Sequence, residues 1–480
     1  MNLNVVAYVI GWVLQLEAAF MMIPAFVGLY YKEFSVCKVY VCIVTLCLFL
    51  GTLVKIGRKG KGELYVREGF ASVALSWIVM SMFGALPFVF TKEITSYVNA
   101  LFETVSGFTT TGISILDEVE TLSKASLFWR SFTHWIGGMG VFMLILALLP
   151  MLGANSINLM RAESAGPSVD RILPKIRDTA IMIYSLYIGL TVLGTIALLI
   201  SGMNLFESST MIFGTVGTGG FSIFNDSAAS LTPAQQWIIA IFMTLGAVNY
   251  TTYYLLLMGH VKKAFAIEEV RLYFIFIIVS VVLISINITH LYCSMSEVLR
   301  HAYFQVSSVI TTAGFASTDF NIWPTFSKTV LLVIMLIGGC SGSTAGGFKV
   351  SRLIILMKAI KRELQKVIHP NMKKIIYMDN HVLSDETLRS ANVFAAVYFL
   401  VLLISTVLIS IDNFDLMTNF SAVATSVNGV GVAFEKVGFG CNFDIYSSFS
   451  KFVLMFDMIA GRLEFFPLLV LFVPSCWKKF

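Results

Sequence analysis

The sequence carries four versions of one short glycine-rich turn: TTTGIS at 109–114, GTGGFS at 217–222, TTAGFA at 311–316 and NGVGVA at 428–433. The fourth residue of each version is a glycine, and these are Gly112, Gly220, Gly314 and Gly431. The turns lie roughly 100 residues apart, and a regular period of this kind indicates one structural unit that is used four times. One such turn is a weak signal, but four in register point to a single repeated architecture.

The chain around these turns is strongly apolar. Hydrophobic residues make up 57% of the 480 residues and charged residues only 13%, whereas a soluble domain carries about 25% charged residues. A mean hydropathy of +0.83 would leave more apolar surface than a soluble fold of this length can bury. These values exclude a soluble enzyme, a disordered chain and a nucleic-acid binder. We therefore expect an integral membrane protein.

Ten apolar runs have about 20 residues or more, the length that a helix needs to cross the hydrocarbon core of a membrane. Basic residues fall in alternate loops between these runs, and the positive-inside rule makes that side cytoplasmic. We therefore expect a multi-pass protein with both termini in the cytoplasm. The runs lie at 4–30, 36–56, 69–90, 124–150, 179–202, 233–258, 272–292, 325–357, 390–411 and 449–475.

A shorter apolar segment of about 10–14 residues precedes each turn and is too short to cross, so we expect a re-entrant half-helix. The carbonyl end of such a helix would point inward, where its dipole favours a cation. The glycines let the backbone bend so that carbonyl oxygens face a central axis. Rings of carbonyls that replace the hydration shell of an ion form a cation selectivity filter. The filter residues that we predict are Thr110, Thr111, Gly112, Ile113, Gly219, Gly220, Phe221, Thr312, Ala313, Gly314, Phe315, Asn428, Val430, Gly431 and Val432.

The predicted fold class follows from these units. It is an all-α integral membrane protein with four pseudo-symmetric helix–pore-helix–filter–helix repeats around a central pore, plus two extra N-terminal transmembrane helices. The expected boundaries are 1–62 for the two N-terminal helices, then 63–155, 156–264, 265–372 and 373–480 for pore repeats 1 to 4.

The decapeptide GGCSGSTAGG at 338–347 interrupts the apolar run at 325–357. Its five glycines and three small hydroxyl residues cannot hold a lipid-facing helix, so this backbone must lie inside protein. We expect a gating loop directly below the filter, with close helix packing through small residues as the alternative. The predicted gate residues are Gly338, Gly339, Gly342, Ser343, Thr344, Gly346, Gly347, Lys349 and Arg462.

Two basic residues belong to this predicted gate. Arg462 lies near the middle of the last run, where a charge is costly and normally faces an interior or an aqueous path. It could donate to carbonyls of the loop and add a positive barrier below the filter, or it could pair locally with Asp457 or Glu464. Lys349 is either an interior residue near the cytoplasmic mouth or a lysine that snorkels to the membrane interface.

Two other functions compete with a pore. Residues 339–342 match the GxSG of rhomboid-like intramembrane proteases, which would need Ser341 within hydrogen-bond reach of His134. That interpretation leaves the four turns unexplained, so we expect no enzyme and no catalytic residue. We instead expect His134 to be a satisfied histidine whose substitution leaves ion selectivity unchanged. Ion-coupled secondary transporters also bind ions at broken helices, but those folds use two repeats, usually inverted, rather than four parallel ones.

With these motifs the chain resembles the Trk/Ktr/HKT superfamily of potassium transporters, and within it the membrane subunit of the bacterial Trk system. The two N-terminal spans resemble the Trk branch. One departure is the fourth turn, SVNGVGVAF at 426–434, where the family pattern has an asparagine pair and a proline. The further matching segments are FWRSFTHWIGGMGVFMLILALLP at 128–150, ESAGPSVDRILPKIRDTA at 163–180, GGCSGSTAGGFKVSR at 338–352 and GRLEFFPLLVLF at 461–472.

The resemblance implies single-file potassium uptake across the cytoplasmic (inner) membrane, with K⁺ held by filter carbonyls and no covalent cofactor. Members with serine at the first filter glycine tend to favour sodium, so Gly112 supports potassium. The resemblance also implies a homodimer and a cytosolic regulatory subunit of the RCK type (TrkA-like), through which a nucleotide (ATP/ADP or NAD) would act. We expect this subunit on a basic face formed by 151–178 and 349–389, although anionic lipid headgroups could also occupy that face.

Overall fold

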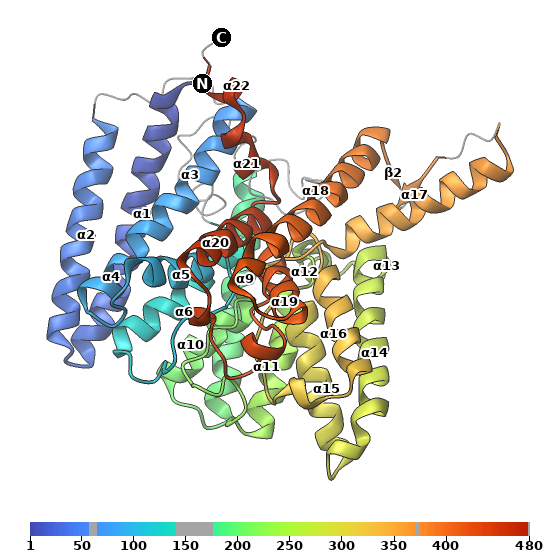
Figure 1. Ribbon diagram of the computed structural model, residues 1–480, viewed down its shortest axis with the longest axis horizontal. Coiled ribbons are helices and arrows are strands. Elements are labelled where there is room, and N and C mark those ends of the chain that lie inside the picture. Colours follow the sequence, from blue (N-terminus) through green and yellow to red (C-terminus); the bar gives the residue numbers. More distant parts are fainter. Residues whose placement is uncertain (57–64, 141–175, 371–374, 380, 479–480) are drawn as a thin grey trace.

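The computed structural model describes residues 1–56, 65–140, 176–370, 375–379 and 381–478. These residues are mostly helical, and their strands form one hairpin, in which β1 (Tyr377–Met378) pairs antiparallel with β2 (His381–Val382). The N- and C-termini lie close together at one end of the molecule (Figure 1). There the ammonium group of Met1 donates to the carbonyl oxygen of Lys478 at 2.9 Å. Both termini therefore lie at the same end of the molecule.

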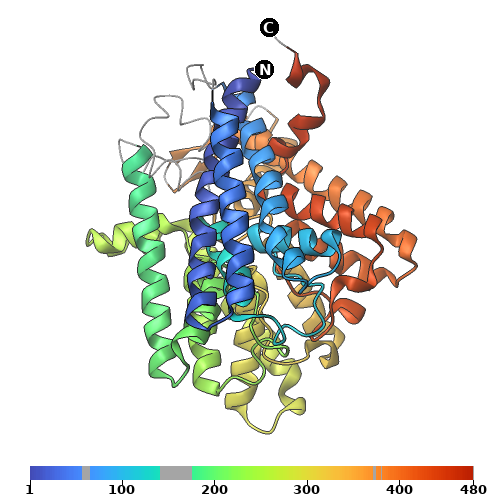
Figure 2. The same cartoon turned by 90° about the vertical axis from the view of Figure 1, so that its left-hand side faces the viewer.

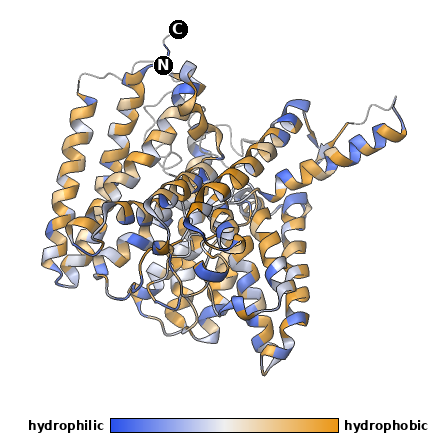
Figure 3. Cartoon of the chain, in the orientation of Figure 1, coloured by the Kyte–Doolittle hydropathy of each residue, from blue (hydrophilic) through white to orange (hydrophobic). Residues whose placement is uncertain are grey.

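Within the described residues, six helices are long and apolar enough to cross a membrane. Their outward faces are hydrophobic (Figure 3) and include exposed side chains such as Ile278, Leu403 and Val407. Contiguous exposed apolar surface of this extent marks contact with lipid, so the chain is a multi-pass membrane protein. The helices are α1 (Leu3–Tyr30), α2 (Phe34–Lys55), α3 (Val66–Gly84) continued by α4 (Leu86–Phe90), α9 (Ile176–Ile200), α14 (Glu268–Ile288) and α18 (Asp385–Ile409).

The two predicted N-terminal spans correspond to α1 and α2, which run beside each other at one edge of the molecule (Figures 1 and 2). Two small residues let them approach closely. A Cβ added to Gly11 or to Gly51 would lie 2.9 Å from the carbonyl oxygen of the other glycine. Close approach through small residues is how helices associate in lipid, where no hydrophobic force drives them together.

A short helix precedes each glycine-rich turn, as predicted. Asn204, Ser294 and Asp415 are the N-caps of three of these helices. The side chain of each accepts a hydrogen bond from the backbone N–H three residues further on. Hydrogen bonds from Thr418 hold the pKa of the Asp415 carboxyl below its usual range, which keeps a negative charge at that helix N-terminus. The helices have 12–16 residues and are α5 (Tyr97–Phe108), α10 (Leu205–Val216), α15 (Met295–Ile310) and α19 (Leu416–Asn428).

The helix that follows each turn is also short, so the prediction of continuous spans at 233–258 and 449–475 is wrong, whereas the run at 325–357 is interrupted at 338–347 as its composition predicts. For the predicted span at 124–150 the helix ends at Met139, and residues 141–150 lie outside the described residues. A crossing needs about 20 residues, whereas these helices have 13–16 residues. They are α6 (Lys124–Met139), α11 (Pro233–Gly246), α16 (Thr325–Ile337) and α20 (Ser448–Arg462).

The backbone explains why the apolar runs overestimate these helices. After α16, Gly338 takes a φ of +76°, and after α20, Glu464 and Phe465 take φ values of +55° and +66°. A positive φ ends a right-handed helix whatever the hydropathy of the residues around it. In the second repeat, α11 and the next helix meet at 93°. The helices that resume after these breaks are α12 (Tyr250–Leu257), α17 (Val350–Ile368) and α21 (Phe466–Leu469).

Helix α17 and the β-hairpin project from the body of the molecule (Figure 1). They carry part of the predicted basic face, but Lys349 and Arg352 of that face are buried rather than exposed, so the face is smaller than predicted. Residues 151–175 and 371–374 of it lie outside the described residues. The remaining short elements are α13 (Val261–Ala266), α22 (Pro474–Trp477), η2 (Thr289–Leu291), η3 (Phe320–Ile322), η4 (Ser410–Asp412), η5 (Glu435–Val437), η6 (Phe443–Ile445) and η7 (Val470–Phe472).

Candidate cation-conduction site

The four glycine-rich turns share one backbone conformation. The fourth residue has a positive φ in every turn: +81° at Gly112, +85° at Gly220, +77° at Gly314 and +92° at Gly431. The second residue has one too: +56° at Thr110, +52° at Thr218, +58° at Thr312 and +67° at Gly429. Glycine takes this conformation readily, whereas a threonine held there is strained, and such strain collects at functional sites.

The same hydrogen bond anchors each turn to the helix before it. It runs from the N–H of the third residue in the turn to a carbonyl near the helix end. In a trans peptide the C=O points opposite to the N–H, so the carbonyl of the second residue points away from that helix. The N···O distances are 2.9 Å from Thr111 to Ser106, 2.8 Å from Gly219 to Gly214, 2.9 Å from Ala313 to Ser308 and 3.0 Å from Val430 to Thr425.

The turns contact one another in sequence order, and the fourth returns to the first. A Cβ added to the glycine of one turn would collide with the carbonyl oxygen of the third residue in the next turn. The distances are 1.9 Å from Gly112 to Gly219, 2.2 Å from Gly220 to Ala313, 2.3 Å from Gly314 to Val430 and 2.7 Å from Gly431 to Thr111. Side-chain carbons do not approach oxygen so closely, so glycine at all four positions lets the turns pack in this arrangement, and a larger residue would require the neighbouring turn to shift.

The other predicted filter residues lie in the same region. Asn428 ends α19, where its amide donates to the Ala424 carbonyl at 2.7 Å and accepts from the Tyr398 hydroxyl at 2.9 Å. The residues that follow the four glycines are all buried, and they are Ile113, Phe221, Phe315 and Val432. All the turn residues predicted from the sequence are therefore brought together.

The loop 338–347 is irregular, as its composition predicts, and lies against the second repeat. Its glycines Gly338, Gly342 and Gly347 have φ values of +76°, +65° and +83°. The hydroxyl of Thr344 donates to the carbonyls of Val216 and Gly246 at 3.1 and 3.0 Å. These two carbonyls end helices α10 and α11 and lack intrahelical donors, so Thr344 satisfies groups that the helix ends leave open.

The same loop touches two of the glycine-rich turns. The N–H of Gly346 donates to the hydroxyl of Thr312 in the third turn at 2.7 Å. A Cβ added to Gly346 would lie 2.2 Å from the carbonyl oxygen of Asn428, at the start of the fourth turn. Predicted gate and predicted filter are thus in direct contact through Gly346.

Arg462, at the end of α20, joins the loop to the first repeat. Its guanidinium donates to the carbonyl of Thr344 at 3.0 Å and to the carbonyl of Gly138 at 2.6 Å. The two local acids that could have paired with it have other partners. Glu464 forms an ion pair with Arg352, and Asp457 accepts from the Ser405 hydroxyl at 2.8 Å.

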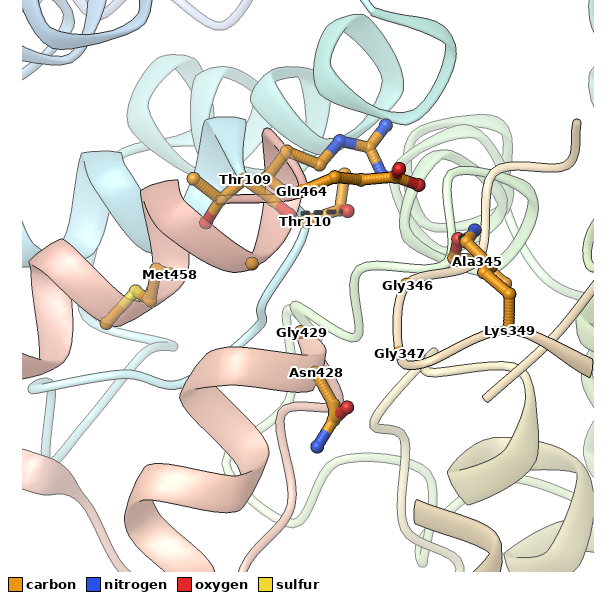
Figure 4. A pocket seen from close by; sticks show the side chains of 12 residues that line it. Thr109, Thr110, Ala345, Gly346, Gly347, Lys349, Asn428, Gly429, Met458 and Glu464 are labelled. Carbon is orange, nitrogen blue, oxygen red and sulfur yellow. Dashed lines mark hydrogen bonds between the residues drawn. The ribbon is translucent and has the colours of Figure 1, made fainter. Parts of the chain in front are cut away.

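Lys349 is an interior residue rather than a snorkelling one. It is 2% exposed, and its ammonium group donates to the carbonyl of Ala345 in the loop. Figure 4 shows Lys349, Gly346, Asn428 and Thr110 around a common cavity of about 20 Å³ between the turns and the loop. The loop and the turns thus line one small cavity.

Sequence reasoning missed Glu269, the second residue of α14. Its carboxylate accepts from the backbone N–H of Ser341, inside the loop, at 2.6 Å and from that of Ser351, at the start of α17, at 3.1 Å. The side chain is 3% exposed. Paired acids at 268–269 look like an ordinary helix N-terminus in the sequence, so only the structure singles out the buried one.

His134 is buried and its ring nitrogens are hydrogen-bonded, as expected. Its contact with the second turn argues against the expectation that its substitution leaves ion selectivity unchanged. Its Nδ1 lies 2.8 Å from the Gly107 carbonyl, and its Nε2 accepts from the N–H of Phe221, a predicted filter residue, at 3.1 Å. Both ring nitrogens are therefore committed. The Ser341 hydroxyl is hydrogen-bonded to the hydroxyl of Ser351, so the serine–histidine pair that a protease needs is not formed.

An all-helical membrane protein whose four carbonyl-bearing turns close into a ring above a glycine-rich loop has the features of a membrane cation transporter. The TrkH family model, described as a cation transport protein, matches residues 38–479. The chain belongs to the TrkH family, which consists of transporters and not of enzymes.

Relatives cover the whole chain. It is 35% identical over 486 residues to the Trk system potassium uptake protein TrkH of Escherichia coli K12, with 100% of both chains covered. Identity to the Trk system potassium uptake protein TrkG of the same organism is 30%, with 100% of this chain and 99% of that protein covered. The crystal structure of the potassium transporter TrkH from Vibrio parahaemolyticus superposes with a TM-score of 0.89 at 31% identity, and covers 100% of both chains.

Proposed function

We propose that this protein takes up potassium through a selectivity filter made of its four glycine-rich turns. The observation that carries the proposal is the closed series of contacts in which each turn's glycine meets a carbonyl oxygen of the next turn. Stacked rings of carbonyl oxygens can replace the hydration shell of a dehydrated cation. The predicted filter residues in the four turns supply these oxygens.

The chain around the filter would then consist of four pseudo-symmetric pore repeats around a central pore. Each repeat has a spanning helix, a short helix, a turn and a second short helix, with the boundaries at 63–155, 156–264, 265–372 and 373–480. Helices α1 and α2 stand outside this plan. Parallel repeats suit a pore, whereas the two inverted repeats of many secondary transporters suit alternating access.

Such a pore needs no coupling ion to accumulate potassium. A membrane potential of about 100 mV, inside negative, contributes about 2.3 kcal/mol per elementary charge, which corresponds to accumulation of roughly 50-fold. Coupling to protons or sodium would be a second candidate mechanism, and transport assays separate the two.

The loop 338–347 and Arg462 would form the gate in its closed position. The loop lies below the turns, and the guanidinium holds it there by donating to the Thr344 carbonyl. Lys349 places a second positive charge beside the cavity, where it would repel an entering cation. Opening would require the loop to leave the space between the filter and the cytoplasm.

In the cell the protein would lie in the inner membrane as a homodimer with both termini in the cytoplasm. A cytosolic nucleotide-binding subunit of the RCK type would dock on the face that carries α17 and the β-hairpin, and would act on the gate. Co-purification of such a subunit with the intact protein tests this part, and recovery of anionic lipid without protein would contradict it.

The transport proposal is tested with the purified full-length protein in liposomes. Radioactive rubidium, which substitutes for potassium, should accumulate when the liposomes have a membrane potential that is negative inside and is generated without valinomycin. Excess potassium should compete with this uptake better than excess sodium. Equal competition by sodium would overturn the potassium filter. Uptake that requires a proton or sodium gradient in addition to the potential would favour the coupled mechanism.

A further inference from the structure

The four repeats differ at two buried positions of the helix that follows each turn. Because apolar side chains fill these positions in repeats 2 to 4, the helix does not need polar ones to pack. Counted from the N-caps Ser123, Thr232, Pro324 and Ser447, the seventh residue is Arg130 in α6 but Ile239, Leu331 and Leu454 in the others. The eleventh residue is His134 in α6 but Met243, Met335 and Met458 in the others.

The short helices differ in the same way at a third position. Glu103 lies in α5, nine residues before Gly112, and is 1% exposed. The residues nine before the other three turn glycines are Met211, Gln305 and Ala422. Repeat 1 therefore carries an acid, a base and an imidazole where its counterparts carry mostly apolar residues. A buried charged group is costly unless it is paired, so these three residues require a reason.

Arg130 links the first and second repeats. Its Nε donates to Glu103 at 2.6 Å, and its Nη1 donates to the carbonyl of Ser222, the last residue of the second turn, at 2.7 Å. The guanidinium also lies over the ring of Phe221, 3.6 Å from the centroid. The positive charge thus stands behind the second turn, and Glu103 neutralises it.

Glu103 fixes the end of the first turn. Its carboxylate accepts from the N–H of Ile115 at 3.0 Å and from the hydroxyl of Ser114 at 3.0 and 3.1 Å. Together with Arg130 it therefore ties the residues that leave turn 1 to the residues that leave turn 2. Charge-assisted hydrogen bonds of this kind are about twice as strong as neutral ones.

His134 adds a second tie between the same two repeats. It donates through Nδ1 to Gly107 of α5 and accepts through Nε2 from Phe221 of the second turn. A Cβ added to Gly219 would lie 2.2 Å from the imidazole ring, so the histidine packs directly against the back of the second turn.

We propose that Glu103, Arg130 and His134 form a brace that holds turns 1 and 2 at a fixed spacing and thereby helps to set the ion preference of the filter. The three are positioning residues, since the contacts described here lie behind the turns. The inference rests on the proposed filter. Its physical basis is that discrimination between ions of different size depends on where the carbonyl oxygens are held. The brace keeps the carbonyl oxygens of turns 1 and 2 in place.

The test converts repeat 1 to the residues of its counterparts. In His134→Met both neutral hydrogen bonds are lost, while the position receives the residue that repeats 2 to 4 use. In the double variant Glu103→Met/Arg130→Ile the whole ion pair is replaced by the residues of repeat 2. Replacing both partners of a buried pair by apolar residues is often neutral for stability, so this variant is expected to fold. The matched control is Met335→Leu, at the equivalent position of repeat 3.

Full-length variants are reconstituted in liposomes, and the ratio of rubidium to sodium uptake is measured together with the melting temperature in detergent. We expect both brace variants to lower the ratio by about 2- to 12-fold, which is equivalent to about 0.5–1.5 kcal/mol, while Met335→Leu keeps the wild-type ratio. Wild-type ratios in both brace variants, or an equal fall in the control, would overturn the brace. A wild-type protein without rubidium preference would instead overturn the proposed filter.

Discussion

The guanidinium of Arg462 donates to the carbonyl oxygen of Thr344 at 3.0 Å, across 118 residues of chain. Through its second amino group it also donates to the Gly138 carbonyl at the end of α6. One side chain from the fourth repeat thus joins the loop of the third repeat to the first. Because the loop cannot supply its own helical hydrogen bonds, its carbonyls need donors from elsewhere, and Arg462 is one of them.

Replacement of Arg462 by alanine is expected to open the pore. A hydrogen bond from a charged donor is worth about 1.5–3 kcal/mol net, so its loss shifts a balance between closed and open loop by about 10- to 150-fold. Rubidium flux into liposomes should rise within that range, and the rubidium/sodium ratio should stay constant because the filter is untouched. The control is Arg362→Ala, which breaks pairs with the exposed acids Glu363 of α17 and Asp385 of α18. A lower flux with normal folding would make Arg462 a structural support.

Thr344→Val tests the other attachment of the loop. Valine keeps the shape of threonine but cannot donate to the Val216 and Gly246 carbonyls. A neutral hydrogen bond contributes about 0.5–1.5 kcal/mol, and the hydroxyl has one hydrogen to share, so flux should rise by about 2- to 12-fold. Thr329→Val is the matched control, because that hydroxyl bonds only within its own helix, to the Thr325 carbonyl. Deletion of residues 342–346 should raise flux further, since it removes the obstruction itself.

The outcome for the turns and for the helices after them shows what the sequence can and cannot reveal. Gly112 and its three counterparts are predictable because a glycine at a fixed place in four copies leaves a visible pattern. The break after α20 is less visible, since Glu464 and Phe465 take positive φ although neither is a glycine. Hydropathy counts such a segment as one span because it is apolar on both sides of the break.

Contacts between residues that are distant in the sequence are harder to predict from the sequence than the turns are. The partners Glu103 and Arg130 are 27 residues apart, and nothing in their spacing marks them as neighbours. Arg462 was identifiable because a charge in an apolar run is costly, but its partners are backbone carbonyls, which every residue carries. The sequence therefore indicates which residue is unusual, and the fold determines what it touches.

Glu269→Gln should loosen the loop from α14. Glutamine can still accept a hydrogen bond from Ser341 or Ser351, but it loses the charge that strengthens these bonds. The difference between charged and neutral hydrogen bonds is about 1 kcal/mol, so rubidium flux should rise by about 5-fold. The neighbouring Glu268→Gln is the control, because Glu268 pairs with Lys358 in a partly exposed position and such pairs contribute little. Equal flux in the two variants would exclude Glu269 as an anchor.

Gly112→Ser should weaken the preference for potassium. The residue has a φ of +81°, and any Cβ would lie 1.9 Å from the Gly219 carbonyl oxygen. The turn must therefore shift, and the serine hydroxyl adds a ligand that suits the smaller sodium ion. We expect the rubidium/sodium ratio to fall by about tenfold, equivalent to about 1.4 kcal/mol.

The control for that variant must carry the same backbone strain without the collision, and His134 cannot serve because it contacts the second turn. Gly202→Ser meets the requirement. Gly202 has a φ of +93°, and an added Cβ would have no atom within 4 Å. A left-handed serine costs about 1–2 kcal/mol at either site, so both variants carry this backbone strain, while only Gly112→Ser should change the ratio. If both variants keep the wild-type ratio in competition uptake, the carbonyl at Gly219 does not line the ion path, and the filter must be sought elsewhere in the pore.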